Sequence, residues 1–158
     1  MQSKTSARGR RNPEARTTAL DTSVVVAALL GWHQHHARAR AALERALAAG
    51  NTLVLPGHVL VEAYAVLTRL PSGNRVAPAA AEEMLRQSFE SRTRVVTLTG
   101  NDLWSMLRAS GRTGVAGGLT YDARILAAAR KARADDLLTL NVRDYDRLDA
   151  GSVRLVEP

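Results

Sequence analysis

The chain has 158 residues, of which 46% are hydrophobic and none is cysteine. This length and apolar content suit a single domain around one core. The lack of cysteine excludes disulfides, thiol catalysis and every zinc site that needs sulfur. No apolar stretch approaches the roughly 20 residues of a membrane span, so we expect a cytoplasmic protein with no membrane partner.

The net charge is +7, and most of this excess lies near the N-terminus. Residues 1–16 carry five basic side chains and one acidic side chain, which gives +4 of the total. We expect residues 1–16 to form a disordered basic tail and residues 17–158 to form the folded domain. The alternative is that the tail is an arm that contacts nucleic-acid phosphates. The abundance of arginine favours a polyanionic partner.

Strand-like and helix-like segments alternate along the chain. Apolar runs rich in Val and Leu predict strands at 17–20, 52–55, 94–98, 136–140 and 152–156. Ala-rich or amphipathic segments predict a helix directly after Asp21 and further helices at about 37–49, 58–69, 78–90, 102–110 and 120–133. This order predicts an α/β fold, a three-layer α/β/α sandwich with a central, mostly parallel sheet.

Three acidic residues stand inside runs that are otherwise apolar. Asp21 follows the first expected strand, Glu62 lies in the helix after the second strand, and Asp122 lies in the first turn of a later helix. Burying an unpaired carboxylate costs several kcal/mol. Only Arg124 provides a cation within these runs, so we infer one shared countercharge, for which a divalent metal ion is the simplest candidate.

Two further polar residues, Asn141 and Asp144, follow the fourth expected strand. Because open α/β sheets bind ligands beyond the carboxyl ends of their strands, we expect all five oxygen-bearing side chains to converge at that edge. Oxygen ligands suit Mg²⁺ or Mn²⁺, and a pair of such ions can clamp the attacking water and the leaving oxygen of a phosphodiester. Together with the positive charge, the pattern predicts a metal-dependent nuclease.

Each acidic residue also has a simpler interpretation when taken alone. Asp21 can be a helix N-cap, and Glu62 can form an ion pair with Arg69. Asp122 can be a helix-start charge that the helix dipole favours, and Asp144 can belong to a turn. Their order and their position relative to the strands favour a common site.

Four segments carry this pattern in order, and they begin at Leu20-Asp21-Thr22-Ser23, Leu60-Val61-Glu62-Ala63, Tyr121-Asp122-Ala123-Arg124 and Leu137-Leu138-Thr139-Leu140-Asn141. They resemble the acidic motifs of PIN domains, most closely those of the VapC-type ribonuclease toxins of bacterial toxin–antitoxin pairs. The resemblance covers residues 17 to 156. It implies a parallel-sheet sandwich, Mg²⁺-dependent RNA cleavage, a homodimer and a small cognate antitoxin.

The metal-binding and catalytic residues that the resemblance implies are all acidic: Asp21, Glu62, Asp122 and Asp144. Nearby polar side chains can hydrogen-bond these carboxylates or hold water and substrate, namely Thr22, Ser23, Thr139 and Asn141. Some relatives carry an aspartate where this chain has Asn141, so either Asn141 or Asp144 completes the site.

Two other functions remain open at this point. An acid-cluster phosphotransferase would use Asp21 as its nucleophile, although such enzymes usually carry a second aspartate where this chain has Ser23. A non-catalytic PIN-like module would only bind RNA or a protein partner. Four acids on a phosphate-binding surface count against that interpretation, because they repel the ligand.

The histidines and tryptophans give weaker signals. His33, His35 and His36 fall in a predicted turn, and adjacent residues on a helix cannot face one ion. We therefore expect solvated rings near RNA or the antitoxin. Trp32 and Trp104 are expected to pack in the core, with stacking on a base as the alternative.

Overall fold

Five short parallel strands form the centre of the protein. The computed structural model describes residues 15–158, so the predicted tail lies outside the described residues except for its last two positions. The strands are β1 (Thr17–Leu20), β2 (Thr52–Pro56), β3 (Thr93–Val96), β4 (Asp136–Leu138) and β5 (Arg154–Val156). Their order is β3-β2-β1-β4-β5, and every pair is parallel. The predicted α/β class is confirmed, with a fully parallel sheet.

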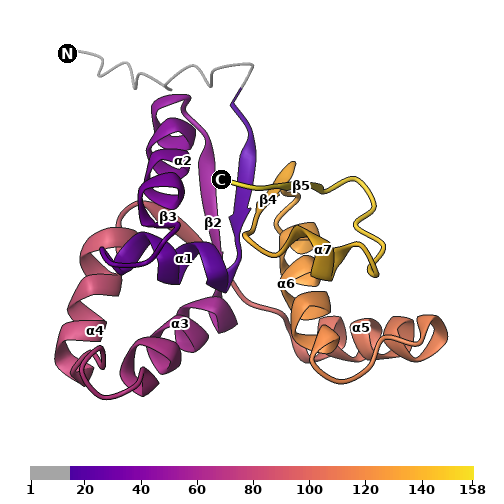
Figure 1. Ribbon diagram of the computed structural model, residues 1–158. Coiled ribbons are helices and arrows are strands. Elements are labelled where there is room, and N and C mark those ends of the chain that lie inside the picture. The colour runs from indigo at the N-terminus through magenta and orange to yellow at the C-terminus, as the bar shows by residue number, and fades with distance from the viewer. Residues whose placement is uncertain (1–14) are drawn as a thin grey trace, which may run out of the picture.

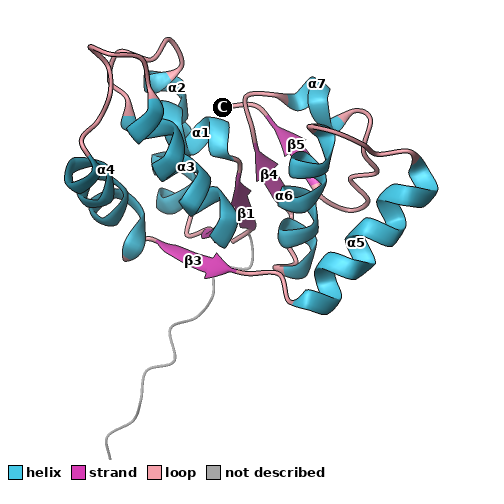
Figure 2. Cartoon of the chain, turned by 90° about the horizontal axis from the view of Figure 1, so that it is seen from below, coloured by secondary structure: helices cyan, strands magenta, loops and turns pink. Residues whose placement is uncertain are grey.

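Helices cover both sides of this sheet (Figures 1 and 2). One side carries α1 (Thr22–Leu29), α2 (His36–Ala48), α3 (Gly57–Arg69) and α4 (Pro78–Leu85). The other side carries α5 (Gly100–Thr113) and α6 (Leu119–Lys131), and the short α7 (Val142–Tyr145) precedes β5. The helix predicted at 78–90 is interrupted, because Arg86–Glu90 forms a π-helical turn. Within the described residues, no helix has the length and apolar character needed to cross a membrane.

The strand boundaries differ from the prediction mainly at the carboxyl edge of the sheet. β3 and β4 end two residues early, and β5 begins two residues late. After Leu138 the backbone N–H of Leu140 donates to the Ser23 hydroxyl at 3.1 Å instead of to a neighbouring strand. After Val96 the chain turns to begin α5, where the Thr99 hydroxyl accepts a capping hydrogen bond. Beyond β4 the Ser23 hydroxyl therefore takes over a backbone hydrogen bond, and beyond β3 the chain enters the cap of a helix.

The strand order reverses between β1 and β4. From β1 the chain winds outward through β2 to β3, then crosses back to place β4 on the other side of β1. The fully buried Leu20, Val54 and Leu137 pack in the core around these central strands. In open α/β sheets, the carboxyl ends of the strands at such a reversal are the usual place for a ligand.

Helix α5 lies at the margin of the molecule, and Figure 2 shows it extending outward past α6. Its side chains Leu103, Trp104 and Leu107 are 38%, 64% and 46% exposed, and only Ser110 of this helix is buried. Trp32, in the turn after α1, is 57% exposed. The prediction that both tryptophans pack in the core is therefore wrong, because α5 and this turn lie at the surface and hold these two side chains in contact with solvent.

A buried carboxylate joins three segments at the amino edge of the sheet. Asp136, 5% exposed at the start of β4, accepts hydrogen bonds from the guanidinium groups of Arg16 and Arg154 at 2.7 to 3.0 Å. Burial raises the pKa of Asp136, but these two arginines outweigh burial and hold that pKa below its ordinary value. Arg16, which the sequence placed in the tail, thus contacts the folded domain.

We predict that Asp136→Asn lowers the free energy of unfolding by about 2 kcal/mol at neutral pH, because two guanidinium groups lose a charged acceptor. A carboxylate whose pKa is depressed on folding stabilises the protein above its unfolded-state pKa. The difference between the variants should therefore shrink below about pH 4 in urea denaturation. Asp146→Asn, at an exposed position, is the matched control and should change little. Equal stability of wild type and Asp136→Asn at pH 7 would contradict this role.

Candidate active site

The carboxylate of Asp21 lies where β1 ends, next to β4. Asp21 occupies the N-cap position of α1, but its side chain makes no capping hydrogen bond. Instead, Oδ2 accepts hydrogen bonds from the hydroxyls of Ser23 and Thr139, both at 2.6 Å. The N-cap interpretation thus describes the backbone position but not what the side chain does. The carboxylate is oriented by α1 and by the segment after β4, which are far apart in sequence.

The two hydroxyls that bind Asp21 are themselves fixed by backbone groups. Leu140 N–H donates to Ser23 Oγ at 3.1 Å, and Asn141 N–H donates to Thr139 Oγ1 at 3.0 Å. Each hydroxyl thus accepts a backbone hydrogen bond and donates its own proton to the same carboxylate oxygen. This arrangement keeps Asp21, only 4% exposed, in one orientation. It also supplies the hydrogen bonds that a buried carboxylate needs.

The second carboxylate comes from α3. Glu62 Oε2 accepts a hydrogen bond from the Thr22 hydroxyl at 2.7 Å, so α1 and α3 are linked at the site. The proposed ion pair between Glu62 and Arg69 is not among the ion pairs found in residues 15–158. Two consecutive hydroxyl residues, Thr22 and Ser23, therefore orient two different acids.

The third carboxylate, Asp122, lies in the first turn of α6 on the other side of the sheet. Burial, and then the negative charges of Asp21, Asp144 and Glu62 in that order of importance, together raise the pKa of Asp122 to about 6. Burial also raises the pKa of Asp21, partly offset by the hydrogen bonds from Ser23 and Thr139, and the charge of Glu62 adds to the increase. The acids are thus close enough to repel one another.

These groups line one pocket of about 450 Å³. Its polar lining is Asp21, Thr22, Ser23, His33, Gln34, His35, Glu62, Tyr121, Asp122 and Asn141. The structure therefore brings three of the four predicted acids together with Asn141. The fourth acid, Asp144, is exposed on α7 and does not line the pocket, although its charge reaches Asp122.

The pocket has the chemistry of a cation site but not a closed metal cage. None of the ion pairs found among residues 15–158 involves Asp21, Glu62 or Asp122. In the same part of the chain, no three His, Cys, Asp or Glu side chains are gathered closely enough to hold an ion by themselves. Mg²⁺ suits such a site, because it keeps several waters and takes one or two carboxylates directly.

Some residues at the site were not predicted from the sequence. Tyr145 on α7 is fully buried, and its hydroxyl lies close to the carboxylate of Asp21. Burial, and then the charges of Asp21 and Asp122, raise the pKa of Tyr145, so the phenol stays neutral beside the acids. The only signal in the sequence is its place at the end of the fourth acidic motif. Tyr121 also lines the pocket, next to Asp122.

The histidine turn is closer to the site than expected. His33 is half-buried in the pocket wall, and His36 begins α2 with its Nδ1 at 2.9 Å from the Ala27 carbonyl oxygen. All three rings are partly buried, so the prediction of solvated rings in a turn holds only in part. Burial lowers the pKa of His33, and the neighbouring His35 and His36 lower it further.

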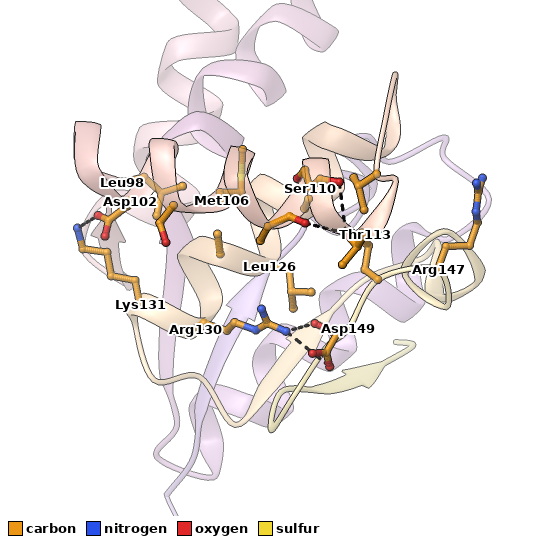
Figure 3. A pocket seen from close by; sticks show the side chains of 16 residues that line it. Leu98, Asp102, Met106, Ser110, Thr113, Leu126, Arg130, Lys131, Arg147 and Asp149 are labelled. Atoms are coloured by element: carbon orange, nitrogen blue, oxygen red, sulfur yellow. Dashed lines mark hydrogen bonds and ion pairs between the residues drawn. The ribbon is translucent and has the colours of Figure 1, made fainter.

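A larger hollow of about 620 Å³ lies elsewhere, between α5, α6 and residues 147–149 (Figure 3). Four of its five charged groups already have partners, because Asp102 pairs with Lys131 and Arg130 pairs with Asp149. It contains no unpaired cluster of acids. The smaller acidic pocket is therefore the candidate active site.

The comparison with known protein families agrees with this geometry. A family model for the PIN domain matches residues 18–151. The chain belongs to the PIN-domain family. The PIN-domain match includes all four acidic motifs, and the resemblance found in the sequence is confirmed.

Individual relatives support the same assignment. Ribonuclease VapC40 of Mycobacterium tuberculosis is 37% identical over 131 residues, which cover 81% of this chain and 91% of the relative. Ribonuclease VapC27 of the same species is 35% identical over 138 residues, or 87% and 94% of the two chains. The solved structure of VapBC2 from Rickettsia felis, bound to a DNA fragment from their promoter, aligns with a TM-score of 0.66 at 20% identity. That alignment covers 90% of this chain and 98% of the other, and it supports the PIN-domain fold.

We predict that Asp122→Asn stabilises the metal-free protein at pH 7.5 by about 1 kcal/mol, a value reduced for partial exposure to water. A carboxyl whose pKa is raised on folding destabilises the fold when it is charged, so the gain should be present above about pH 6 and disappear well below it. Urea denaturation in EDTA at pH 7.5 and pH 4.5 measures the difference, with Asp146→Asn as the control. A loss of stability at pH 7.5 would show that repulsion does not dominate this pocket.

Proposed function

We propose that this PIN domain is a metal-dependent endoribonuclease and the toxin of a toxin–antitoxin pair. The observation that carries the proposal is that three carboxylates from β1, α3 and α6 line one pocket at the reversal of strand order. Two relatives that are 37% and 35% identical to this chain over the aligned residues are named ribonucleases. Ordered acids in a pocket of this kind suit hydrolysis of a phosphodiester.

In this proposal Asp21 and Asp122 hold the principal Mg²⁺ or Mn²⁺, and Glu62 and Asp144 orient its waters or a second ion. A bound ion of this kind neutralises phosphate charge and supplies an activated water. Asn141 lines the pocket, so its neutral amide suits a contact with water or substrate. Asp144 lies outside the pocket lining, and its charge also helps to raise the pKa of Asp122.

The contribution of the chain itself is to keep the acids oriented and charged. Ser23 and Thr139 donate to Asp21, which stabilises its ionised form against the cost of burial. Burial, and then repulsion by the neighbouring acids, raise the pKa of Asp122 to about 6, so a proton competes with a cation for this group near that pH. Exposed arginines, such as Arg143 two residues after Asn141, provide contacts to the RNA backbone without reading bases.

The cognate partner and the homodimer belong to the same proposal. The name VapBC2 and the resemblance to VapC-type toxins support a small antitoxin that blocks the acidic pocket. For the homodimer we propose the outer face of α5, where Leu103, Trp104 and Leu107 are exposed. Apolar side chains grouped on one exposed helix face mark a protein contact, and a two-fold pair of identical helices is the simplest way to cover them.

We predict that the purified protein cleaves RNA with Mg²⁺ or Mn²⁺ and stops cleaving in EDTA. Asp21→Asn should reduce the rate at least about 1,000-fold, because the ion loses its principal ligand. Circular dichroism should show an unchanged fold, and Asp146→Asn should cleave as wild type does. Wild-type rates from Asp21→Asn would disprove the site assignment. A phospho-aspartate trapped on Asp21 would support the phosphotransferase, and RNA binding without cleavage would support the non-catalytic module.

We predict that Trp104→Glu converts a dimer into a monomer, because a buried charge on the contact face has no partner. Light scattering coupled to size-exclusion chromatography measures the change. Trp32→Glu places the same charge at another exposed tryptophan and should leave the dimer intact. If Trp104→Glu remains a dimer, the contact between copies does not use α5.

A further inference from the structure

Two of the four exposed aromatic residues of this protein lie at or beside the acidic pocket. Of its six aromatic residues, only Phe89 and Tyr145 are buried. Tyr121 lines the pocket and is 60% exposed, and Trp32 is 57% exposed beside the pocket residue His33. A single exposed aromatic side chain needs no explanation, but rings on two sides of a polar pocket indicate a ligand with flat apolar faces.

The ring of Tyr121 is positioned before any ligand arrives. The Arg124 guanidinium lies 5.6 Å from the ring centroid, at the distance of a cation–π contact. Both residues are in the first turns of α6, which also carries Asp122. The ring is therefore fixed next to an acid of the site while most of its surface remains available.

The opposing wall comes from the turn between α1 and α2, on the other side of the sheet. Its rings form a row, with centroids 6.4 Å apart for Trp32 and His33 and 5.6 Å apart for His33 and His35. His33 Nδ1 accepts the backbone N–H of His35 at 3.1 Å, so this nitrogen carries no proton and the neutral ring keeps its proton on Nε2. The wall thus offers ring faces and a neutral donor rather than positive charge.

We propose that Tyr121 on one wall and the Trp32–His35 turn on the other bind two unstacked bases of a single-stranded RNA. The phosphate between those bases then lies over Asp21 and Asp122. Bases inside a duplex have no free faces, whereas splayed bases of loops stack on aromatic side chains. The inference rests on the proposed ribonuclease function and adds the form of the substrate and its positioning residues.

The first test measures stacking directly, without requiring cleavage. A short single-stranded RNA with 2-aminopurine next to the cleaved bond is titrated into the full-length Asp21→Asn protein with Mg²⁺. Stacking on the protein should change the fluorescence of 2-aminopurine in Asp21→Asn. The double variant Asp21→Asn/Tyr121→Ala should lose this change in fluorescence. The double variant Asp21→Asn/Tyr121→Phe should keep it, because phenylalanine retains a ring that can stack. Tyr64→Ala, which removes an exposed tyrosine of α3 outside the pocket, is the matched control and should keep it too.

The second test measures cleavage by the otherwise wild-type protein. Tyr121→Ala and His33→Ala should each raise KM about tenfold with little change in kcat, because a stacked base contributes to ground-state and transition-state binding alike. Tyr121→Phe should stay close to wild type. The same sequence annealed to its complement should be cleaved far more slowly.

The outcomes separate this inference from the proposed function. If the wild type cleaves no RNA, the ribonuclease proposal fails, but the fluorescence experiment still decides whether the walls stack bases. Unchanged fluorescence and KM in Tyr121→Ala and His33→Ala overturn the inference. Equal cleavage of duplex and single strand also overturns it. So does a result in which Tyr121→Ala weakens only the binding of a co-expressed antitoxin, since the walls would then belong to a protein interface.

Discussion

The buried carboxylate of Asp21 is the constraint around which the rest of the site is organised. At 4% exposure it needs hydrogen bonds, and Ser23 and Thr139 supply them from α1 and from the end of β4. The same hydroxyls accept the backbone N–H groups of Leu140 and Asn141, which ends β4 early. The shape of the sheet edge thus follows from the need to satisfy one charge.

Placing more acids around that charge lowers the free energy of unfolding, because like charges repel one another. The fold nevertheless holds them together. Glu62 and Asp122 approach from α3 and α6, and their mutual repulsion appears in the raised pKa of Asp122. Stability has to come from elsewhere, namely from the apolar core around β1, β2 and β4 and from the ion pairs of Asp136 at the opposite edge. A site with excess negative charge lowers the stability of the fold, which is the usual compromise between stability and function.

The sequence predicts the fold and much of the pocket lining because both depend on local patterns. Alternating strands and helices define the sheet, and an acid inside an apolar run indicates Asp21, Glu62 and Asp122. The choice between Asn141 and Asp144 could not be made, because it depends on how α7, only four residues long, turns after β4.

Other features depend on contacts between distant parts of the chain. Arg16 and Asp136 are 120 positions apart, and no local pattern connects them. Exposed aromatic residues are equally difficult to predict, because hydrophobic periodicity assigns Trp32 and Trp104 to a core that they never reach. Both errors concern residues whose surroundings are set only when the tertiary structure forms.

The entry of the chain into β1 has a practical consequence for handling the protein. Arg16 is bound to Asp136 at the amino edge of the sheet, whereas Asp21 lies at the carboxyl edge, a strand length of roughly 13 Å away. A tether or fluorescent label attached through the N-terminus therefore joins the domain on the edge that faces away from the pocket.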